Sequence, residues 1–357
     1  MTTNDDRTVI KLSSPSDIVA ALPVLIGFRP SESFAVMCLR GPRRRIGLTM
    51  RLDLPDPRHD DAVTDDLAHR AERDGADTVV AVCYTESPDV DGDLPRRDLM
   101  GALTGALKPR GIGWLELLLV RGGRWYSYVC TDDCCPPEGT PTTGEPSSEM
   151  LALEARAALE GHAVLDSREE LEATIRGPVA VREAALKALY ERIGGSFAED
   201  LSTHGADQML RHTLELARTS YERFRRGDHA LPDDDAVRIL VGLEDKLARD
   251  ALLTWGLDGH AEELIVFLSA LARCALDENA APICSALACV AYQVGDGALT
   301  NIAVERALRN EPDYELARLI DMALQAHIEP VEIRAMAQRT RDRLREWGIG
   351  RSDAAAA

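Results

Sequence analysis

The sequence predicts an α/β fold in the N-terminal half, in which helices pack on a mixed sheet, followed by an all-helical C-terminal half. Three observations support this prediction. Residues 1–135 alternate between short β-rich runs and helical patterns. Residues 136–148 are dominated by Pro, Gly, Ser and Thr, which is typical of a loop. From residue 149 to about 350 no segment has the pattern of a strand, and we expect residues 351–357 to be a disordered tail.

The first two elements follow from local patterns. Thr8–Leu12 alternates between apolar and polar residues and predicts a short strand. Residues 13–17 then supply a cap, a proline and an acid, which together start a helix. We expect this helix to reach about Leu25, to be kinked or shortened at Pro23 and to end at Gly27.

The rest of the first half alternates in the same way. We expect five strands, with antiparallel hairpins between the first two and between the last two: Ser33–Arg40, Arg45–Leu54, Thr78–Tyr84, Trp114–Val120 and Trp125–Cys130. Helices are expected at Asp60–Asp74 and at Leu94–Leu107. The almost continuous apolar run at Thr78–Tyr84 is typical of a strand that is buried on both faces.

The second half contains a series of helical patterns separated by turn residues. The expected helices are Glu149–Leu159, Ser167–Ile175, Val179–Ile193, Phe197–Phe224, Asp233–Trp255, Glu262–Leu276, Ile283–Val294, Ala298–Arg309, Tyr314–Ala326 and Pro330–Glu346. Gly194-Gly195 is expected to form one of the turns. The segment from Ala288 to Pro312 has small, aromatic and turn residues where a tetratricopeptide repeat has them, although two antiparallel helices of a bundle explain it as well.

Composition and charge narrow the classes of function. The formal charge is −19 and the pI is about 4.9, so we expect neither nucleic acid nor an anionic membrane surface as a partner. The polar N-terminus does not have the pattern of a signal peptide, and no apolar run is long enough to span a membrane. We therefore expect a cytoplasmic protein with reduced cysteines.

Three of the eight cysteines form the most unusual local feature of the sequence. Cys130, Cys134 and Cys135 lie within six residues, and thiolates at such spacing can hold zinc, with Asp132, Asp133 or a distant His as the fourth ligand. The spacing differs from the usual pair with two intervening residues, and the side chains of adjacent cysteines usually diverge. A redox-active thiol or a purely structural loop therefore remain alternatives.

A second group of candidate residues lies at strand ends. Arg51 and Asp53 are two residues apart on one strand, so their side chains share a face. Ser33 ends a Ser-containing loop that leads into the neighbouring strand. We regard these three residues as candidates for a ligand pocket, with an internal ion pair and ordinary turn chemistry as the alternatives.

Several phrases spread over nearly the whole chain resemble a known family. They are Leu12-x-x-Pro15-x-Asp17-Ile18-x-Ala20-x-x-Pro23-x-Leu25-x-Gly27-Phe28-x-Pro30-x-x-Ser33, Arg51-x-Asp53-Leu54-Pro55, Gly123-Arg124-Trp125, Cys130 with Cys134-Cys135-Pro136-x-x-Gly139, Arg249-Asp250, Gly295-Asp296-Gly297-Ala298-Leu299 and Pro312-x-Tyr314-x-Leu316-Ala317. Together they resemble an actinobacterial family catalogued as domain of unknown function 4192. The resemblance implies a cytoplasmic actinobacterial protein and supplies no substrate, cofactor or catalytic residue.

Three hypotheses about function follow. The favoured one is an adaptor or regulatory protein that binds a partner protein through its helical half, since the sequence lacks the common catalytic motifs. The second is an enzyme with a site at the strand ends of the α/β half, near Arg51, Asp53 and the Cys130–Cys135 loop. The third is a metal- or redox-responsive protein that uses Cys130, Cys134 and Cys135. The sequence leaves the oligomeric state open.

Overall fold

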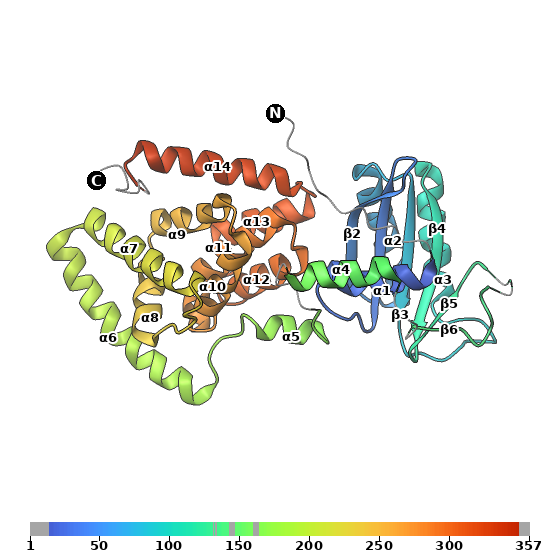
Figure 1. Ribbon diagram of the computed structural model, residues 1–357, viewed down its shortest axis with the longest axis horizontal. Helices are drawn as coiled ribbons and strands as arrows, with labels where there is room; N and C mark the ends of the chain where they lie inside the picture. Colours follow the sequence, from blue (N-terminus) through green and yellow to red (C-terminus); the bar gives the residue numbers. More distant parts are fainter. Residues whose placement is uncertain (1–13, 131, 133, 143–146, 160–163, 350–357) are drawn as a thin grey trace. The chain divides into compact units, whose positions relative to one another are not determined.

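The computed structural model describes residues 14–130, 132, 134–142, 147–159 and 164–349, and the chain forms two compact units, Met1–Arg168 and Glu169–Ala357 (Figure 1). The first unit contains a mixed sheet with helices and the second is helical, so the predicted fold class is confirmed. The strand expected at Thr8–Leu12 and the tail expected at 351–357 lie outside the described residues.

The sheet of the first unit has six strands in the order β2-β1-β3-β4-β5-β6. Their bounds are β1 Ser33–Arg40, β2 Arg45–Asp53, β3 Thr78–Tyr84, β4 Gly113–Arg121, β5 Arg124–Ser127 and β6 Thr140–Pro141. β3 and β4 are parallel, and every other neighbouring pair is antiparallel. The two expected hairpins are present, and the loop expected at residues 136–148 contains the short edge strand β6.

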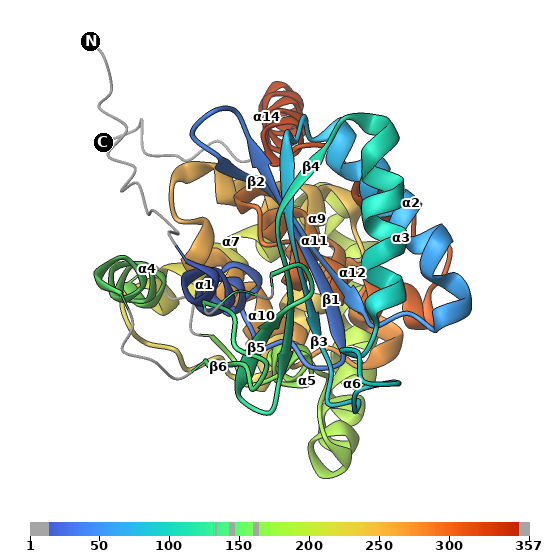
Figure 2. The same ribbon diagram turned by 90° about the vertical axis from the view of Figure 1, so that its right-hand side faces the viewer.

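Helices cover both faces of this sheet, which explains the apolar runs of β1 and β3. On one face, α2 (Asp60–Arg73) and α3 (Arg97–Leu107) pack on the alternate residues that include Val36 and Ala81. On the other face, α1 (Pro15–Ile26) packs on the intervening residues, such as Met37 and Val80 (Figure 2). Both faces of β1 and β3 are therefore buried, as expected for strands without polar alternation.

Helix α1 begins and ends where the sequence predicts. The Ser14 hydroxyl accepts a hydrogen bond from the Asp17 N–H, while the Asp17 carboxylate accepts one from the Ser14 N–H. Gly27 ends the helix with φ of 80°. Pro23 lies inside the helix, which continues to Ile26, so Pro23 does not shorten it, and the kink expected as the alternative stays a prediction. Packing of the buried face of α1 on the sheet outweighs the one hydrogen bond that a proline removes.

Helix α4 (Ser148–Leu159) belongs to the first unit, although the sequence places it in the helical domain that begins at residue 149. It contacts α1, and Met150 is buried. The chain then returns to the end of α1, where the Leu165 N–H donates to the Gly27 carbonyl at 3.0 Å and the Leu165 carbonyl accepts from the Arg29 N–H at 2.9 Å. These contacts place the end of the first unit at Arg168, after α4.

The second unit is built from ten α-helices among the described residues. They are α5 Arg168–Ala173, α6 Ala180–His204, α7 Ala206–Arg225, α8 Asp233–Gly242, α9 Lys246–Leu253, α10 Ala261–Ala272, α11 Ala280–Val294, α12 Gly297–Asn310, α13 Glu315–Gln325 and α14 Pro330–Glu346. The first residue of α5 is the last residue of the first unit.

Helix α11 is the centre of the second unit. Its residues 280–293 are all buried, and it contacts α9, α10, α12, α13 and α14. Ala, Cys and Ser make up much of its sequence, and small side chains allow neighbouring helices to approach closely. The turn into α12 uses Gly295 with φ of 87°, and the Asp296 carboxylate caps α12 by accepting from the Leu299 N–H at 2.9 Å. The likeness of this hairpin to a tetratricopeptide repeat stays a prediction.

The boundaries of three expected helices are wrong, namely Val179–Ile193, Phe197–Phe224 and Asp233–Trp255. Gly194-Gly195 does not form a turn, because α6 continues through both glycines and ends at His204, with Gly205 between α6 and α7. A glycine inside a helix costs only about 1 kcal/mol, which neighbouring helical residues outweigh. The helix expected at Asp233–Trp255 is divided into α8 and α9, because Asp245 caps a new helix by accepting from the Leu247 N–H at 2.7 Å.

Candidate metal centre

The cysteines of the first unit that could bind a ligand lie on the segment that joins β5 to β6, between residues 127 and 140. We call this segment the excursion. The two strands pair with each other, so the base of the excursion is closed. The Arg124 side chain strengthens this closure by donating to the carbonyls of Glu138 and Gly139 at 2.8 and 2.9 Å. The cysteines are therefore carried by a segment whose two ends are fixed to the sheet.

The first arm of the excursion is held by Tyr128 and Ser127. The Tyr128 ring is buried against α3 and the sheet, and its hydroxyl donates to the Pro95 carbonyl at 2.6 Å. The Ser127 hydroxyl accepts from the Cys130 N–H at 3.0 Å, a local turn that fixes the backbone of Cys130. Neither residue is predicted from the sequence as a positioning group, and the one signal for it is the large aromatic Tyr128 two residues before Cys130.

The second arm is held by two turns and by packing. The Cys135 N–H donates to the Asp132 carbonyl at 2.8 Å, and the Gly139 N–H donates to the Pro136 carbonyl at 2.8 Å. Cys135 packs against the apolar cluster on the face of the sheet that α1 covers. Gly139 has φ of 75°, and a Cβ atom there would lie 2.6 Å from the Tyr126 ring, so this turn requires glycine.

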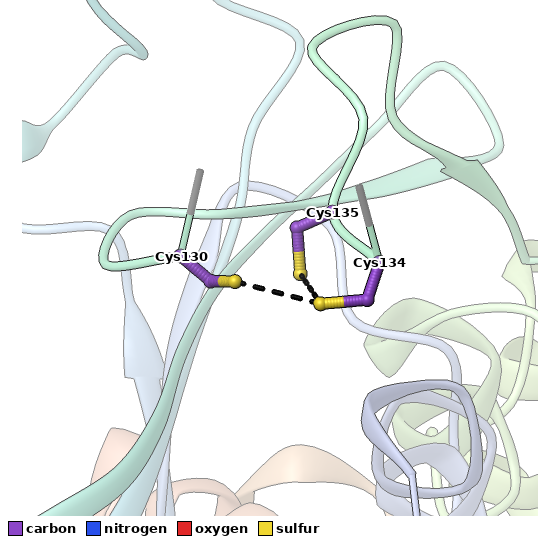
Figure 3. A group of neighbouring side chains, drawn as sticks. All are labelled: Cys130, Cys134 and Cys135. Carbon is purple, nitrogen blue, oxygen red and sulfur yellow. Dashed lines mark hydrogen bonds between the residues drawn. The ribbon is translucent and has the colours of Figure 1, made fainter. Parts of the chain in front are cut away.

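These two arms bring the three thiols together in what we call the thiol cluster, Cys130, Cys134 and Cys135 (Figure 3). The Cys130 and Cys134 Sγ atoms are 3.6 Å apart, and Cys134 Sγ donates to Cys135 Sγ at 3.9 Å. All three Sγ atoms lie within 4.8 Å of one another. The adjacent cysteines 134 and 135 thus turn their sulfurs toward one point, contrary to the expected divergence of neighbouring side chains.

The separations match those of a metal–thiolate site. A Zn–S bond is about 2.3 Å long, so two sulfurs of a tetrahedral site are about 3.8 Å apart. The separations of the Cys134 sulfur from those of Cys130 and Cys135, 3.6 and 3.9 Å, lie on either side of this value. Three thiolates could therefore occupy three corners of one zinc tetrahedron with little rearrangement.

The neighbouring sulfurs shape the acidity of the thiol cluster. The hydrogen bond with Cys130 raises the pKa of the exposed Cys134 thiol. Partial burial, followed by hydrogen bonds with Cys130 and Cys134, raises the pKa of Cys135 to about 12. Negative charge on one sulfur disfavours charge on the next, and a bound cation would remove this penalty.

A fourth ligand is not supplied by the described part of the chain. The group of converging ligand atoms there contains the three sulfurs and no carboxylate or imidazole. Asp132 is exposed but does not join the group, and Asp133 lies outside the described residues. The Cys134 sulfur is exposed, so water can reach a metal ion held by the cluster.

The other candidate residues, Ser33, Arg51 and Asp53, are also brought together. Arg51 donates to the Ser33 hydroxyl at 3.0 and 2.6 Å and forms an ion pair with Asp53 at 2.7 Å, and its guanidinium stacks over the Phe28 ring. The Ser33 hydroxyl donates in turn to the Ser31 carbonyl at 2.6 Å. The polar groups of these three side chains are therefore bound to one another. The Arg51–Asp53 contact is the internal ion pair that the sequence leaves open as an alternative. A ligand pocket at these residues stays a prediction.

Comparison with known proteins identifies a family but no activity. The model of a family described as a domain of unknown function, DUF4192, matches residues 15–331. A search of curated proteins and a search of solved structures find no match. Within the described residues, no helix combines the length and the apolar character that a membrane span requires.

Proposed function

We propose that this chain, which belongs to the DUF4192 family, is a metal-responsive protein that binds a zinc ion through the thiolates of Cys130, Cys134 and Cys135. The observation that carries the proposal is the convergence of three sulfurs at separations close to the edge of a zinc–thiolate tetrahedron. Two of these cysteines are adjacent in sequence, so the convergence depends on the turn that ends at Cys135.

The chemistry of the ligands selects the metal. Thiolates favour zinc and other soft or borderline ions, whereas calcium and magnesium require oxygen ligands. An iron–sulfur cluster is usually held by four cysteines, one more than the thiol cluster offers. Zinc accepts three protein ligands with water in the fourth position, which matches the number of sulfurs and the exposure of Cys134.

The open fourth position favours a responsive rather than a structural role. Structural zinc sites have four protein ligands and are closed to solvent. A site with three ligands on one loop can exchange its metal, and its occupancy then follows the availability of zinc. Zinc binding would join the arm that carries Cys130 to the arm that carries Cys134 and Cys135. A partner or an adjoining surface would respond to the resulting change in this segment.

A redox role is the second candidate, because the Cys130 and Cys134 sulfurs are 3.6 Å apart. A two-electron oxidant such as a peroxide would join them in a disulfide and take up the two electrons and two protons that the thiols release. The raised pKa of Cys134 weighs against this role, since the thiolate is the form that oxidants attack. Zinc binding is therefore the function that the site supports best.

The test is the metal content of untagged protein purified under reducing conditions, measured by plasma mass spectrometry. We expect about one zinc per chain in the wild type and none in a variant with Cys130, Cys134 and Cys135 all replaced by Ser. The circular dichroism spectrum of the variant should match that of the wild type. Wild-type protein that stays metal-free after incubation with zinc, or a variant that retains zinc, would refute the proposal.

A further inference from the structure

A surface of the second unit carries an inference that does not depend on the metal site. Helices α9 and α14 border an open hollow of about 510 Å³, which is within the size range of ligand-binding pockets. The hollow is lined by Lys246, Leu247, Asp250, Met336, Arg339, Thr340, Arg343, Leu344 and Trp347. The sequence favours a partner at the helical half, although Asp250 is the one residue of this lining that its motifs include.

One wall of the hollow is a stripe of residues along α14, two of which are large and apolar. Met336, Thr340, Arg343 and Trp347 follow one another at helical spacing, so they share one side of the helix. Met336 is 45% exposed and Trp347 is 59% exposed, although both are large apolar side chains. The neighbouring side of α14 is held in place by buried Ile333, Ala337 and Leu344, so the stripe is presented by a fixed helix.

The charge of the hollow is opposite to that of the chain. Helix α14 has five arginines and three acidic residues, whereas the whole chain has a net charge of −19. Within the described residues, neither Arg339 nor Arg343 has an ion-pair or hydrogen-bond partner for its side chain, whereas Arg341 is bound by Asp258. Lys246 contributes a third positive charge. Its ion pair with Glu315 is weak, because both side chains are exposed to solvent.

The acidic residue of the hollow does not cancel this charge. Asp250 is bound by the Nε and Nη2 atoms of Arg249 at 2.8 and 2.6 Å. Arg249 is buried and also donates to the Tyr314 hydroxyl at 2.7 Å, which fixes the pair within the unit. The hollow therefore combines an exposed tryptophan and methionine with two unpaired arginines and one weakly paired lysine.

We infer that the hollow between α9 and α14 is a docking site for an acidic amphipathic segment of a partner protein. Apolar side chains of the segment contact Met336 and Trp347, and its carboxylates pair with Arg339, Arg343 and Lys246. Amphipathic helices bind grooves in this way, with anchors at i, i+3 or i+4, and i+7. Tryptophan and arginine are the residue types that most often dominate binding energy at such interfaces.

A second hollow of the same unit shows that arginines in the lining do not by themselves indicate a docking site. It has a volume of about 470 Å³ and is lined by Arg176, Arg306 and Arg309 among several acidic residues. Arg306 is buried, and its guanidinium donates to the carbonyls of Ile175, Ala272 and Ala275. This arginine therefore joins parts of the unit together, whereas no described residue binds the donors of Arg339 and Arg343.

The test measures binding of a fluorescein-labelled peptide of about 16 residues by fluorescence anisotropy. The peptide has leucines at i, i+3, i+4, i+7 and i+11 and mainly glutamates elsewhere, as grooves of this kind require. A control peptide has the same composition in an order that destroys the apolar face. We expect the ordered peptide to bind the full chain at least about 10-fold more tightly than the control, a difference of about 1.4 kcal/mol.

Matched variants locate the binding site. Arg339→Glu with Arg343→Glu should weaken binding at least about 10-fold, and so should Trp347→Ala alone. Arg334→Glu with Arg345→Glu makes the same change of charge on exposed residues of α14 outside the hollow and should leave the affinity within about 2-fold. Equal weakening by both pairs, equal binding of both peptides, or no binding would overturn the inference. A dimer in sedimentation experiments that Trp347→Ala dissociates would also overturn it, because a second copy would then occupy the hollow.

Discussion

The eight cysteines of this chain fall into two groups that differ in their surroundings, five that are buried and three that are partly or fully exposed. Cys38, Cys83 and Cys284 are fully buried, and burial is the main cause that raises their pKa, to about 12 for Cys38 and about 11 for the other two. In the thiol cluster, the main cause at Cys134 is the neighbouring sulfur of Cys130. A bound metal ion would offset the effect of the Cys130 sulfur on the pKa of Cys134, whereas it cannot reach the buried thiols.

The difference shows that the surroundings of a cysteine, more than its sequence, determine its role. The cysteines of β1, β3 and α11 act as small apolar residues that allow close packing. The cysteines of the thiol cluster lie at the end of fixed arms, with their sulfurs directed at one another. Substitutions in the thiol cluster should therefore affect metal binding, whereas substitutions of the buried cysteines should affect stability.

The largest expected effect is the loss of zinc affinity on removing one ligand. Cys134→Ser should weaken zinc binding by more than about 100-fold, since even residues that only support ligands contribute about 10- to 100-fold. Competition with a chromophoric chelator measures the change. Cys284→Ala is the matched control from the buried group and should leave the affinity unchanged; equal losses in the two variants would remove the distinction between the groups.

A strong dependence on pH is the next effect. The pKa values of Cys134 and Cys135 are raised, so at neutral pH both thiols are protonated and must lose a proton when zinc binds. Zinc affinity should therefore rise with pH, by about 10-fold per pH unit for each proton released. Chelator competition between pH 6.5 and 8 measures the slope. A flat profile would mean that these thiols do not ligate the metal.

Substitution in the buried group should affect stability instead. Cys284→Ser places a hydroxyl in a fully buried position of α11 and should lower the free energy of unfolding by about 1–3 kcal/mol. Urea denaturation of the metal-free protein measures it. The same change at exposed Cys134 should cost less than about 0.5 kcal/mol. If Cys134→Ser were the more destabilising variant, the thiol cluster would be part of the packing of the first unit.

The smallest effect concerns the group that positions Cys130. Ser127→Ala removes the hydroxyl that accepts from the Cys130 N–H and should weaken zinc binding by about 10-fold without changing the number of zinc ions bound. Ser127→Thr keeps the hydroxyl and should restore most of the affinity. Chelator competition on both variants checks this. An affinity that is unaffected by Ser127→Ala would show that the remaining contacts fix Cys130.

Much of the fold could be predicted because it depends on local patterns. The buried runs of β1 and β3, the cap at Ser14 and the terminating Gly27 are all visible in short stretches of sequence. The turn expected at Gly194-Gly195 failed because helical residues on both sides outweigh two glycines. Strand alternation places Arg51 and Asp53 on one face, and the hairpin pairs Ser33 with Asp53, whereas the ligand pocket expected at these residues stays a prediction.

The geometry of the sites depends on contacts between distant residues. The spacing of Cys130, Cys134 and Cys135 suggests a metal site only as one of three alternatives, because the convergence of the sulfurs requires the pairing of β5 with β6 and the anchor of Tyr128 on Pro95. The hollow between α9 and α14 joins residues 246–250 to residues 336–347, and no local pattern connects these segments. Such contacts are set by the packing of the whole unit.

The most direct test of the central claim is X-ray absorption at the zinc edge on protein loaded with one equivalent of zinc. We predict a first shell of three sulfurs at about 2.3 Å and one lighter atom at about 2.0 Å in the wild type, and no zinc–sulfur shell when the three cysteines of the thiol cluster are replaced by Ser. A shell of oxygen and nitrogen only in the wild-type protein would show that the thiolates of Cys130, Cys134 and Cys135 do not hold the metal.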